Sequence, residues 1–229
     1  MEIAVLIPAH KESERIGATV EAARAIPGVT RVVVVDDGSE DATPDVAEAA
    51  GAKVVRLIFN VGKGAALEAG AARVADADIV LLLDGDLGET AAQGELLLGP
   101  VLSGEADMVV AGFPRPTGKA GFGLVKGLAR FGIAQMGRGF EANAPLSGQR
   151  ALTNECFATV RPFATGYGVE VALTVRALRA GFRVTEVETT MAHAATGRDL
   201  HGFIHRGRQF VHVGLALLRL AFEKAPTRP

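Results

Sequence analysis

Short apolar runs alternate with amphipathic stretches through the first half of the chain. The apolar runs lie at 3–7, 32–35, 53–57, 79–83 and 108–111. Runs of this length are typical of strands that are buried on both faces of a parallel sheet. The stretches with helical periodicity lie between them, at 14–25, 42–50, 64–74 and 91–102. This alternation predicts βαβ units and a doubly wound, mostly parallel α/β sheet flanked by helices.

The second half of the chain is less regular. Residues 113–150 are rich in glycine with scattered basic residues, which predicts loops and one helix over the open edge of the sheet. Residues 169–180 have a helical pattern that Gly181 closes as a C-cap. A further strand is predicted at 183–188, and a long C-terminal helix at 201–224. Since no internal repeat or low-complexity linker interrupts the pattern, we expect one domain over the whole chain.

Composition narrows the class of protein. The chain has 229 residues, of which 48% are hydrophobic and 22% charged, as in ordinary globular domains. Its formal net charge of −2 gives no positive field, so we expect no nucleic-acid partner. The only cysteine, Cys156, excludes a disulfide framework. Its apolar neighbours favour a small buried residue over a nucleophile.

The N-terminal apolar run does not have the pattern of a signal peptide. It lacks a basic region before it and is too short. No stretch of the chain reaches the roughly 18 apolar residues that span a bilayer. The expectation is therefore a cytoplasmic protein.

Polar side chains cluster where the predicted strands end. The segments are 8–12 after the first strand, 36–39 after the second and 84–86 after the fourth. Open α/β sheets bind ligands at the carboxyl ends of their strands, so this edge is the predicted site. The turn after the second strand leads into a helix, with Ser39 or Asp41 as its cap.

Asp84-Gly85-Asp86 is the strongest single feature. Two carboxylates separated by one glycine can converge on a hard cation, and glycine lets the backbone turn beside a ligand. Oxygen ligands suit Mg²⁺ or Mn²⁺, which would bridge to the phosphates of a donor. The alternative is a solvated acidic turn, and the position after a buried strand favours the cation.

Two further segments point to a nucleotide. Asp36-Asp37-Gly38-Ser39 places carboxylates where a base or ribose can be bound, although in isolation it is typical of a turn. Lys63 lies just before a helix, where backbone amides and an ammonium can meet a phosphate. The segment around Lys63 is not a Walker A loop. No Gly-x-Gly-x-x-Gly follows the first strand, which argues against a dinucleotide enzyme.

Taken in order, these motifs resemble the nucleotide-binding half of the family 2 glycosyltransferases of GT-A fold, over residues 1–112. The resemblance implies a Rossmann-like sheet, a nucleotide-sugar donor and a divalent cation. It implies donor contacts at Pro8, Ala9, Glu12, Asp37, Lys63, Asp84 and Gly85, with Asp84 at the ribose. Asp86 would hold the metal and serve catalysis through it. One departure is Lys11, where many members have asparagine.

Residues 113–200 form the expected acceptor half. Pro145-Leu146-Ser147-Gly148, followed by the segment 162–171, resembles the glucosyl- and mannosyl-3-phosphoglycerate synthases. The resemblance implies a histidine that completes the metal shell after the last strand, and His193 stands there. It implies acceptor contacts at Lys119, Gly148, Gln149, Arg150 and Tyr167.

Glu170 is the candidate catalytic carboxylate of this half. If the resemblance holds, Glu170 orients the acceptor or the sugar, and the product keeps the α configuration. Its position at the start of a helix also fits a plain dipole contact. Ser147-Gly148-Gln149-Arg150-Ala151 is common in other family 2 enzymes, including dolichyl-phosphate sugar synthases. The acceptor therefore stays open.

The C-terminal segment 201–223 has a basic start and an apolar end. Three interpretations compete: a helix on a membrane surface beside a lipid-phosphate acceptor, a basic loop that closes over the pyrophosphate, or a helix that packs in the core or in a homodimer. The basic loop would use Arg198, His201 and Arg206.

The leading hypothesis is transfer of a hexose from UDP-glucose or GDP-mannose to a small phosphorylated acceptor such as 3-phosphoglycerate. An inverting enzyme acting on a polyprenyl phosphate is the first alternative. A non-catalytic nucleotide-binding protein is the second. A nucleotidyltransferase is disfavoured, because the glycine- and basic-rich loop of that class is missing after the first strand.

Overall fold

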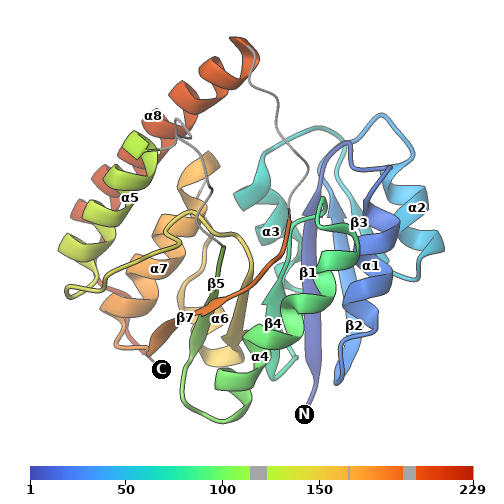
Figure 1. Ribbon diagram of the computed structural model, residues 1–229, viewed down its shortest axis with the longest axis horizontal. Helices are drawn as coiled ribbons and strands as arrows, with labels where there is room; N and C mark the ends of the chain where they lie inside the picture. The colour runs from blue at the N-terminus through green and yellow to red at the C-terminus, as the bar shows by residue number, and fades with distance from the viewer. Residues whose placement is uncertain (114–122, 165, 193–199, 229) are drawn as a thin grey trace.

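The six predicted strands and one further strand, β6, form one seven-stranded sheet in the order β3-β2-β1-β4-β6-β5-β7 (Figure 1). This computed structural model describes residues 1–113, 123–164, 166–192 and 200–228, without the side chains of Tyr167 and residues 200–208. The strands are β1 (Ile3–Ala9), β2 (Val29–Asp36), β3 (Lys53–Arg56), β4 (Ile79–Leu82), β5 (Met108–Gly112), β6 (Arg150–Thr153) and β7 (Val184–Glu188).

The sheet is mostly parallel, as predicted, with one exception. β1 pairs in parallel with both β2 and β4, while β5 pairs in parallel with β7. β6 lies antiparallel between β4 and β5, with Leu81 opposite Ala151. This strand was not among those predicted, because four residues that begin with an arginine give no apolar run.

Helices cover both faces of the sheet and extend beyond one of them (Figure 1). One face carries α1 (Ile16–Arg24), α2 (Thr43–Ala49) and α4 (Gly94–Leu102); the other carries α3 (Lys63–Ala71), α6 (Asn154–Thr159) and α7 (Val169–Arg179). The helices α5 (Gly123–Met136) and α8 (Leu200–Phe222) pack with α7 around a third apolar cluster. Short 3-10 turns, η1 (Gly88–Gln93) and η2 (Gly166–Gly168), precede α4 and α7. The predicted C-terminal helix is thereby confirmed.

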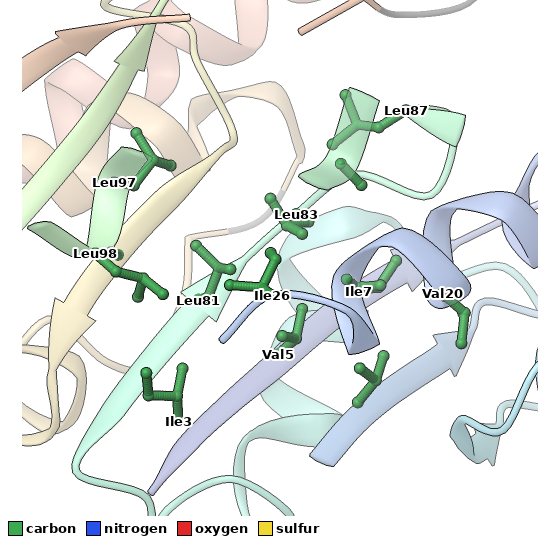
Figure 2. Close-up of a cluster of buried hydrophobic side chains, with 14 of the residues drawn as sticks. Ile3, Val5, Ile7, Val20, Ile26, Leu81, Leu83, Leu87, Leu97 and Leu98 are labelled. Carbon is green, nitrogen blue, oxygen red and sulfur yellow. The ribbon is translucent and has the colours of Figure 1, made fainter. Parts of the chain in front are cut away.

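Strand β1 shows how the apolar runs build the core. Ile3, Val5 and Ile7 point to the layer of α1 and α4, where they meet Leu81 and Leu83 (Figure 2). The residues between them, Ala4 and Leu6, belong to the cluster on the opposite face. Because successive side chains of a strand point to opposite faces, a continuous apolar run is what a strand buried on both faces requires.

The predictions for the end of α7 and for the cysteine are confirmed, while the cap predicted for α2 is wrong. Gly181 adopts a φ of +87° and ends α7, where the Phe182 N–H donates to the Ala177 carbonyl. At the start of α2 the N-cap residue is Ala42 and not the predicted Ser39 or Asp41, although the Asp41 carboxylate accepts from the Thr43 N–H at 3.1 Å. Cys156 is fully buried, and burial raises the pKa of its thiol. This residue is a core residue and not a nucleophile.

None of the helices that the structure describes combines the length and the apolar character that a bilayer span requires.

Candidate active site

A cleft of about 1130 Å³ opens where β1, β2 and β4 end. Its sheet side is lined by Pro8, Ala9, His10, Glu12, Asp37, Asn60, Val61, Gly62, Lys63, Asp84, Gly85 and Asp86. Its other side is lined by Pro162, Phe163, Ala164, Gly166, Glu170, Ala172 and Arg176, and by His212, Leu215, Ala216, Arg219, Leu220 and Glu223 around α8. The fold thus brings together in one cavity the seven residues predicted to contact a donor, together with Asp86 and Glu170.

Asp37 ties the ends of three segments together. Its buried carboxylate accepts hydrogen bonds from the backbone N–H groups of Val61 and Gly62, at 2.8 and 2.9 Å. Its own N–H donates to the Ala9 carbonyl at 2.8 Å. Gly38 adopts a φ of +70°, and a Cβ there would lie 2.5 Å from the backbone of Phe59. Asp37 therefore shapes the loop before α3, and a direct nucleoside contact by it stays a prediction.

Lys63 joins the two halves of the cleft. Its Nζ lies 2.6 Å from Asp84 Oδ1 and 3.0 Å from Glu170 Oε1. Burial by itself lowers the pKa of this ammonium, but the two carboxylates outweigh it and hold the pKa above that of a free lysine. The side chain is thus a fixed cation at neutral pH. Its position at the start of α3 follows from Gly62, which turns the chain with a φ of +88°.

Gln149 holds the second oxygen of Asp84. Its Nε2 donates to Asp84 Oδ2 at 2.7 Å, and its Oε1 accepts from the Ser147 hydroxyl at 3.2 Å. Gln149 is fully buried and lies behind the cleft wall. It was predicted to contact the acceptor, and in this structure it contacts Asp84 instead.

The glycine and the arginine on either side of Gln149 have different places: an acceptor contact by Gly148 stays a prediction, whereas Arg150 is buried away from the cleft. A Cβ at Gly148 would lie 2.4 Å from Lys63 Nζ, so Gly148 leaves room for the lysine. Arg150 is fully buried and donates to the carbonyls of Ser147 and Glu170 and to the Thr174 hydroxyl. Burial lowers the pKa of Arg150 to about 10, which leaves it cationic at neutral pH. A buried side chain with these bonds cannot reach a molecule in the cleft, so it anchors the start of α7.

Asp86 and Glu12 form the acidic end of the cleft. Burial, followed by the charge of Asp86, raises the pKa of Glu12. Arg15 lies beside them and donates to the Asp86 carbonyl at 3.4 Å. A half-buried carboxylate beside a second carboxyl, facing a cleft, is the oxygen-rich setting that Mg²⁺ and Mn²⁺ prefer. The residues present therefore fit a divalent cation.

The second predicted metal ligand, His193, lies outside the described residues. Within the described ranges, no group of three or more histidine, cysteine, aspartate or glutamate side chains is arranged to hold a metal. The chain that leads to His193 is tied to η1, the turn just after Asp86. The Thr190 N–H donates to Gln93 Oε1 at 2.6 Å, and the Ala192 N–H donates to Thr90 Oγ1 at 3.2 Å.

Thr19 is a site residue that the sequence did not reveal. It is fully buried in α1; its hydroxyl lies 2.9 Å from the Gly85 carbonyl and accepts from the Gly88 N–H at 2.8 Å. These contacts fix the turn that carries Asp86. One threonine on the apolar face of a helix gives no signal in the sequence, because the pattern does not tell which loop will lie above it.

Close approaches of glycine set the wall formed by α8. A Cβ at Gly166 would lie 2.3 Å from the ring of His212, and one at Gly168 would lie 2.3 Å from the side chain of Ala216. The segment before them is held to α3, where Glu68 pairs with Arg161 at 2.6 Å and accepts from the Phe163 N–H. Of the remaining predicted acceptor contacts, Lys119 and the Tyr167 side chain lie outside the described residues.

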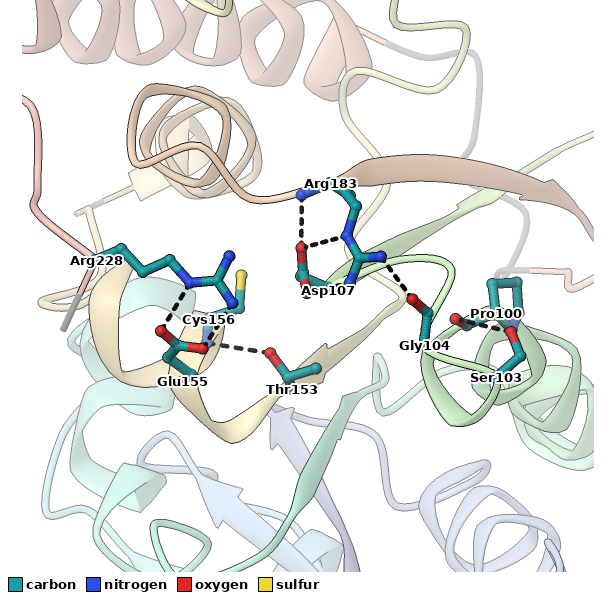
Figure 3. A network of polar contacts seen from close by, with 9 residues as sticks. All are labelled: Pro100, Ser103, Gly104, Asp107, Thr153, Glu155, Cys156, Arg183 and Arg228. Carbon is teal, nitrogen blue, oxygen red and sulfur yellow. Dashed lines mark hydrogen bonds and ion pairs between the residues drawn. The ribbon is translucent and has the colours of Figure 1, made fainter.

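Arginines anchor the carboxyl end of α8. Arg176 binds both carboxylate oxygens of Glu223, at 2.7 and 2.9 Å. Arg179 donates to the carbonyls of Leu220 and Glu223, at 2.7 Å each, at the end of the helix. Beyond the helix, Arg228 pairs with Glu155 at 2.8 Å, beside the Asp107–Arg183 pair (Figure 3). The chain after α8 is thus bound to α6, which carries Glu155.

Comparison with known families gives a match over most of the chain. The family described as glycosyl transferase family 2 matches residues 4–157. The chain is 31% identical over 205 residues to glycosyltransferase AglJ of Haloferax volcanii, covering 86% of this chain and 65% of that protein. It is 36% identical over 194 residues to glucosyl-3-phosphoglycerate synthase of Mycolicibacterium smegmatis, covering 76% of this chain and 63% of that protein. The chain therefore spans less than two thirds of the length of these relatives.

Solved structures share the fold over nearly the whole chain. The glucosyl-3-phosphoglycerate synthase of Mycobacterium tuberculosis, in complex with Mn²⁺, UDP and glucosyl-3-phosphoglycerate, has a TM-score of 0.79 and 28% identity, covering 97% of this chain and 81% of that one. The same enzyme with Mg²⁺ and UDP has a TM-score of 0.80 and 28% identity, covering 97% of this chain and 80% of that one. The GT-A fold expected from the motifs is confirmed.

Proposed function

The chain belongs to glycosyl transferase family 2, and on this basis we propose that it transfers a hexose from a nucleotide-sugar donor to a phosphorylated acceptor. One observation carries the proposal. A cation, Lys63, is held between the carboxylates of Asp84 and Glu170 in a cleft that Asp86 also lines. Residues that we assign to the donor and residues that we assign to the acceptor or sugar thus lie within contact of one lysine.

UDP-glucose is the proposed donor. Solved relatives of this fold bind UDP with Mn²⁺ or Mg²⁺. Here Pro8, Ala9 and Glu12 line the sheet side of the cleft, where the nucleoside would lie, and Asp37 shapes the loop beside it. GDP-mannose is the competing donor, since the residues named here do not distinguish a purine from a pyrimidine.

Asp86 and His193 are the proposed ligands of Mg²⁺ or Mn²⁺. Asp86 offers carboxylate oxygens in the cleft, and the backbone just before His193 is tied to the turn after Asp86. When bound, the cation supplies charge neutralisation for a diphosphate leaving group.

The protein's own groups supply the rest of the chemistry. Lys63 is a cation fixed in the cleft, so it can stabilise negative charge that develops on the leaving phosphate. Glu170, held at 3.0 Å by Lys63, is placed to orient the sugar or the acceptor hydroxyl. We propose retention, so that the product keeps the α configuration of the donor.

The acceptor that this arrangement favours is a small phosphorylated acid such as 3-phosphoglycerate. A synthase named for this product is 36% identical to the chain, and a solved relative contains glucosyl-3-phosphoglycerate. We propose that Lys119 and Tyr167 contact the acceptor directly. Gly148, Gln149 and Arg150 would act by shaping the wall behind it.

A second candidate is transfer to a lipid phosphate at a membrane surface. The observation that favours it is an apolar stripe on the solvent side of α8, formed by Val211, Leu215, Leu218 and Phe222, all exposed. Leu215 also lines the cleft, so the stripe borders the site. The sequences of α5 and α8 contain no acidic residue, which suits an anionic surface.

Donor hydrolysis and transfer, measured with UDP-glucose or GDP-mannose in the presence of Mn²⁺, test the proposal. We expect turnover with 3-phosphoglycerate, an α-configured product by NMR, and loss of turnover in EDTA. Asp86→Ala should abolish it, while Glu89→Ala, at an exposed acidic residue on the next turn, should not. Turnover only with polyprenyl phosphate in vesicles would favour the second candidate. Nucleotide binding without any turnover would leave a non-catalytic binding protein.

A further inference from the structure

Gln149 is held in place through its backbone and through both ends of its side-chain amide. It is fully buried, and its backbone carbonyl accepts from the Ala111 N–H at 3.0 Å, which ties it to β5. The Ser147 hydroxyl donates to its Oε1 at 3.2 Å. With the oxygen of the amide occupied in this way, the NH₂ group is presented to Asp84 Oδ2 at 2.7 Å.

Asp84 is therefore held from two directions. Gln149 binds one carboxylate oxygen from behind the wall, and Lys63 binds the other at 2.6 Å from within the cleft. A neutral amide satisfies an oxygen without adding charge, so the negative charge of Asp84 remains available to the lysine. A second cation in place of the amide would compete with Lys63 for the same carboxylate.

Space at this point is also limited. A Cβ at Gly148 would lie 3.0 Å from both carboxylate oxygens of Asp84, as well as 2.4 Å from Lys63 Nζ. The carboxylate is confined between this backbone and the amide, so its rotation is restricted.

We infer that Gln149 is a positioning residue, which acts on donor turnover by orienting Asp84. The inference rests on the proposed function and adds to it a residue outside the cleft lining. Loss of a hydrogen bond to a charged group corresponds to about tenfold or more in an equilibrium or rate. Gln149→Met keeps the length of the side chain and removes its ability to donate.

A double-mutant cycle with Asp84→Ala tests the inference. With UDP-glucose and Mn²⁺, Gln149→Met should lower kcat/KM about tenfold in the wild-type background and less than about twofold in the Asp84→Ala background. If Asp84→Ala is too slow to assay, the dissociation constant of UDP with Mn²⁺ completes the same cycle by calorimetry. Asn154→Leu is the matched control, because it removes amide hydrogen bonds to the Ala75 and Ala77 carbonyls, at 2.7 and 2.6 Å, away from the cleft.

Failure of the role inferred for Gln149 and failure of the proposed glycosyl transfer give different results. Asn154→Leu should lower the melting temperature and leave kcat/KM within about twofold of wild type. Equal losses of kcat/KM from Gln149→Met in both backgrounds would show a merely structural role and overturn the inference. Where the wild type is active, a Gln149→Met enzyme with the same kcat/KM would also overturn it. A wild type that neither binds UDP nor turns over any nucleotide sugar would refute the proposed function, and the inference with it.

Discussion

The two sides of the cleft are held in place by different physical means. On the donor side, short side chains bind backbone groups of loops and turns: Asp37 holds the loop at Val61 and Gly62, and Thr19 holds the turn at Gly85. On the acceptor side, long arginines reach across the chain, as Arg150 does to Glu170 and Arg176 to Glu223. Glycines there let α8 approach closely.

Both kinds of clamp join segments that are 20 or more residues apart: Asp37 lies 24 residues from Val61, and Arg150 lies 20 residues from Glu170. The two clamps differ in their place relative to the cleft. Asp37 lines the cleft, whereas Arg150 is fully buried and does not line it. Mutations on the donor side should therefore act mainly on binding, and those on the acceptor side on stability as well.

The largest effect is expected at Arg150. Arg150→Met removes the guanidinium donors of the Ser147 carbonyl and one of the donors of the Glu170 carbonyl in a buried site, so we expect the free energy of unfolding to fall by about 3 kcal/mol. Urea denaturation measures this change. Arg176→Met, at a residue that is less buried, should cost about half as much. If Arg150→Met weakened UDP binding without lowering the free energy of unfolding, the difference drawn between the two sides of the cleft would be wrong.

The next effect is expected at Asp37. Asp37→Ala removes both hydrogen bonds to the loop, so we expect UDP binding to weaken by roughly tenfold or more, with a loss of about 2 kcal/mol in stability. Calorimetric titration with UDP and Mn²⁺ gives the affinity. Asp37→Asn has a single acceptor oxygen, so it should keep one of the two bonds and show an intermediate affinity. Equal affinities for the two variants would argue against the clamp.

Gly166→Ala tests the close approach of α8. At φ +69° an alanine is strained, and its Cβ would also lie 2.3 Å from the His212 ring. Gly139→Ala is the matched control. Gly139 has a φ of +81°, and a Cβ there would meet no described atom within 4 Å, so this variant has the backbone strain without the steric clash. We expect a cost of about 1 kcal/mol at Gly139 and about 2 kcal/mol at Gly166, with reduced turnover only at Gly166. Thermal denaturation and donor kinetics together provide the comparison.

The smallest effect is a pH dependence at Glu12. Its pKa in the folded protein is raised above 4.5 by burial and by Asp86, so the fold favours the protonated form. The stability that this gives is complete below the unfolded pKa and is lost as pH rises through the folded pKa. Glu12→Gln should therefore be more stable than wild type at pH 7, by less than about 1 kcal/mol, and the difference should vanish as pH falls below 4.5. Melting curves of Glu12→Gln and the wild type, recorded from acid to neutral pH, measure this difference. A difference in stability that does not change with pH would show that the raised pKa of Glu12 is not its cause.

Much of the fold was predictable because its signals are local. Six of the seven strands coincide with predicted strands, and Gly181 marked the end of α7. β6 was not predictable from its own residues, because Arg150 becomes a core residue only through partners on other segments. The same reason explains why Arg150 and Gln149 resembled acceptor contacts in the sequence and proved to be buried supports.

The order of amino acids was enough to show that a parallel sheet would end in a row of carboxylates, since strand periodicity and strand-end motifs are properties of neighbouring residues. How those groups are used depends on the folded chain. Folding set Lys63 between Asp84 and Glu170, placed Gln149 behind Asp84, and brought Thr19 beneath Gly85. Hydrogen bonds require distances of about 3 Å, and for groups on distant segments only the packing of those segments sets such distances.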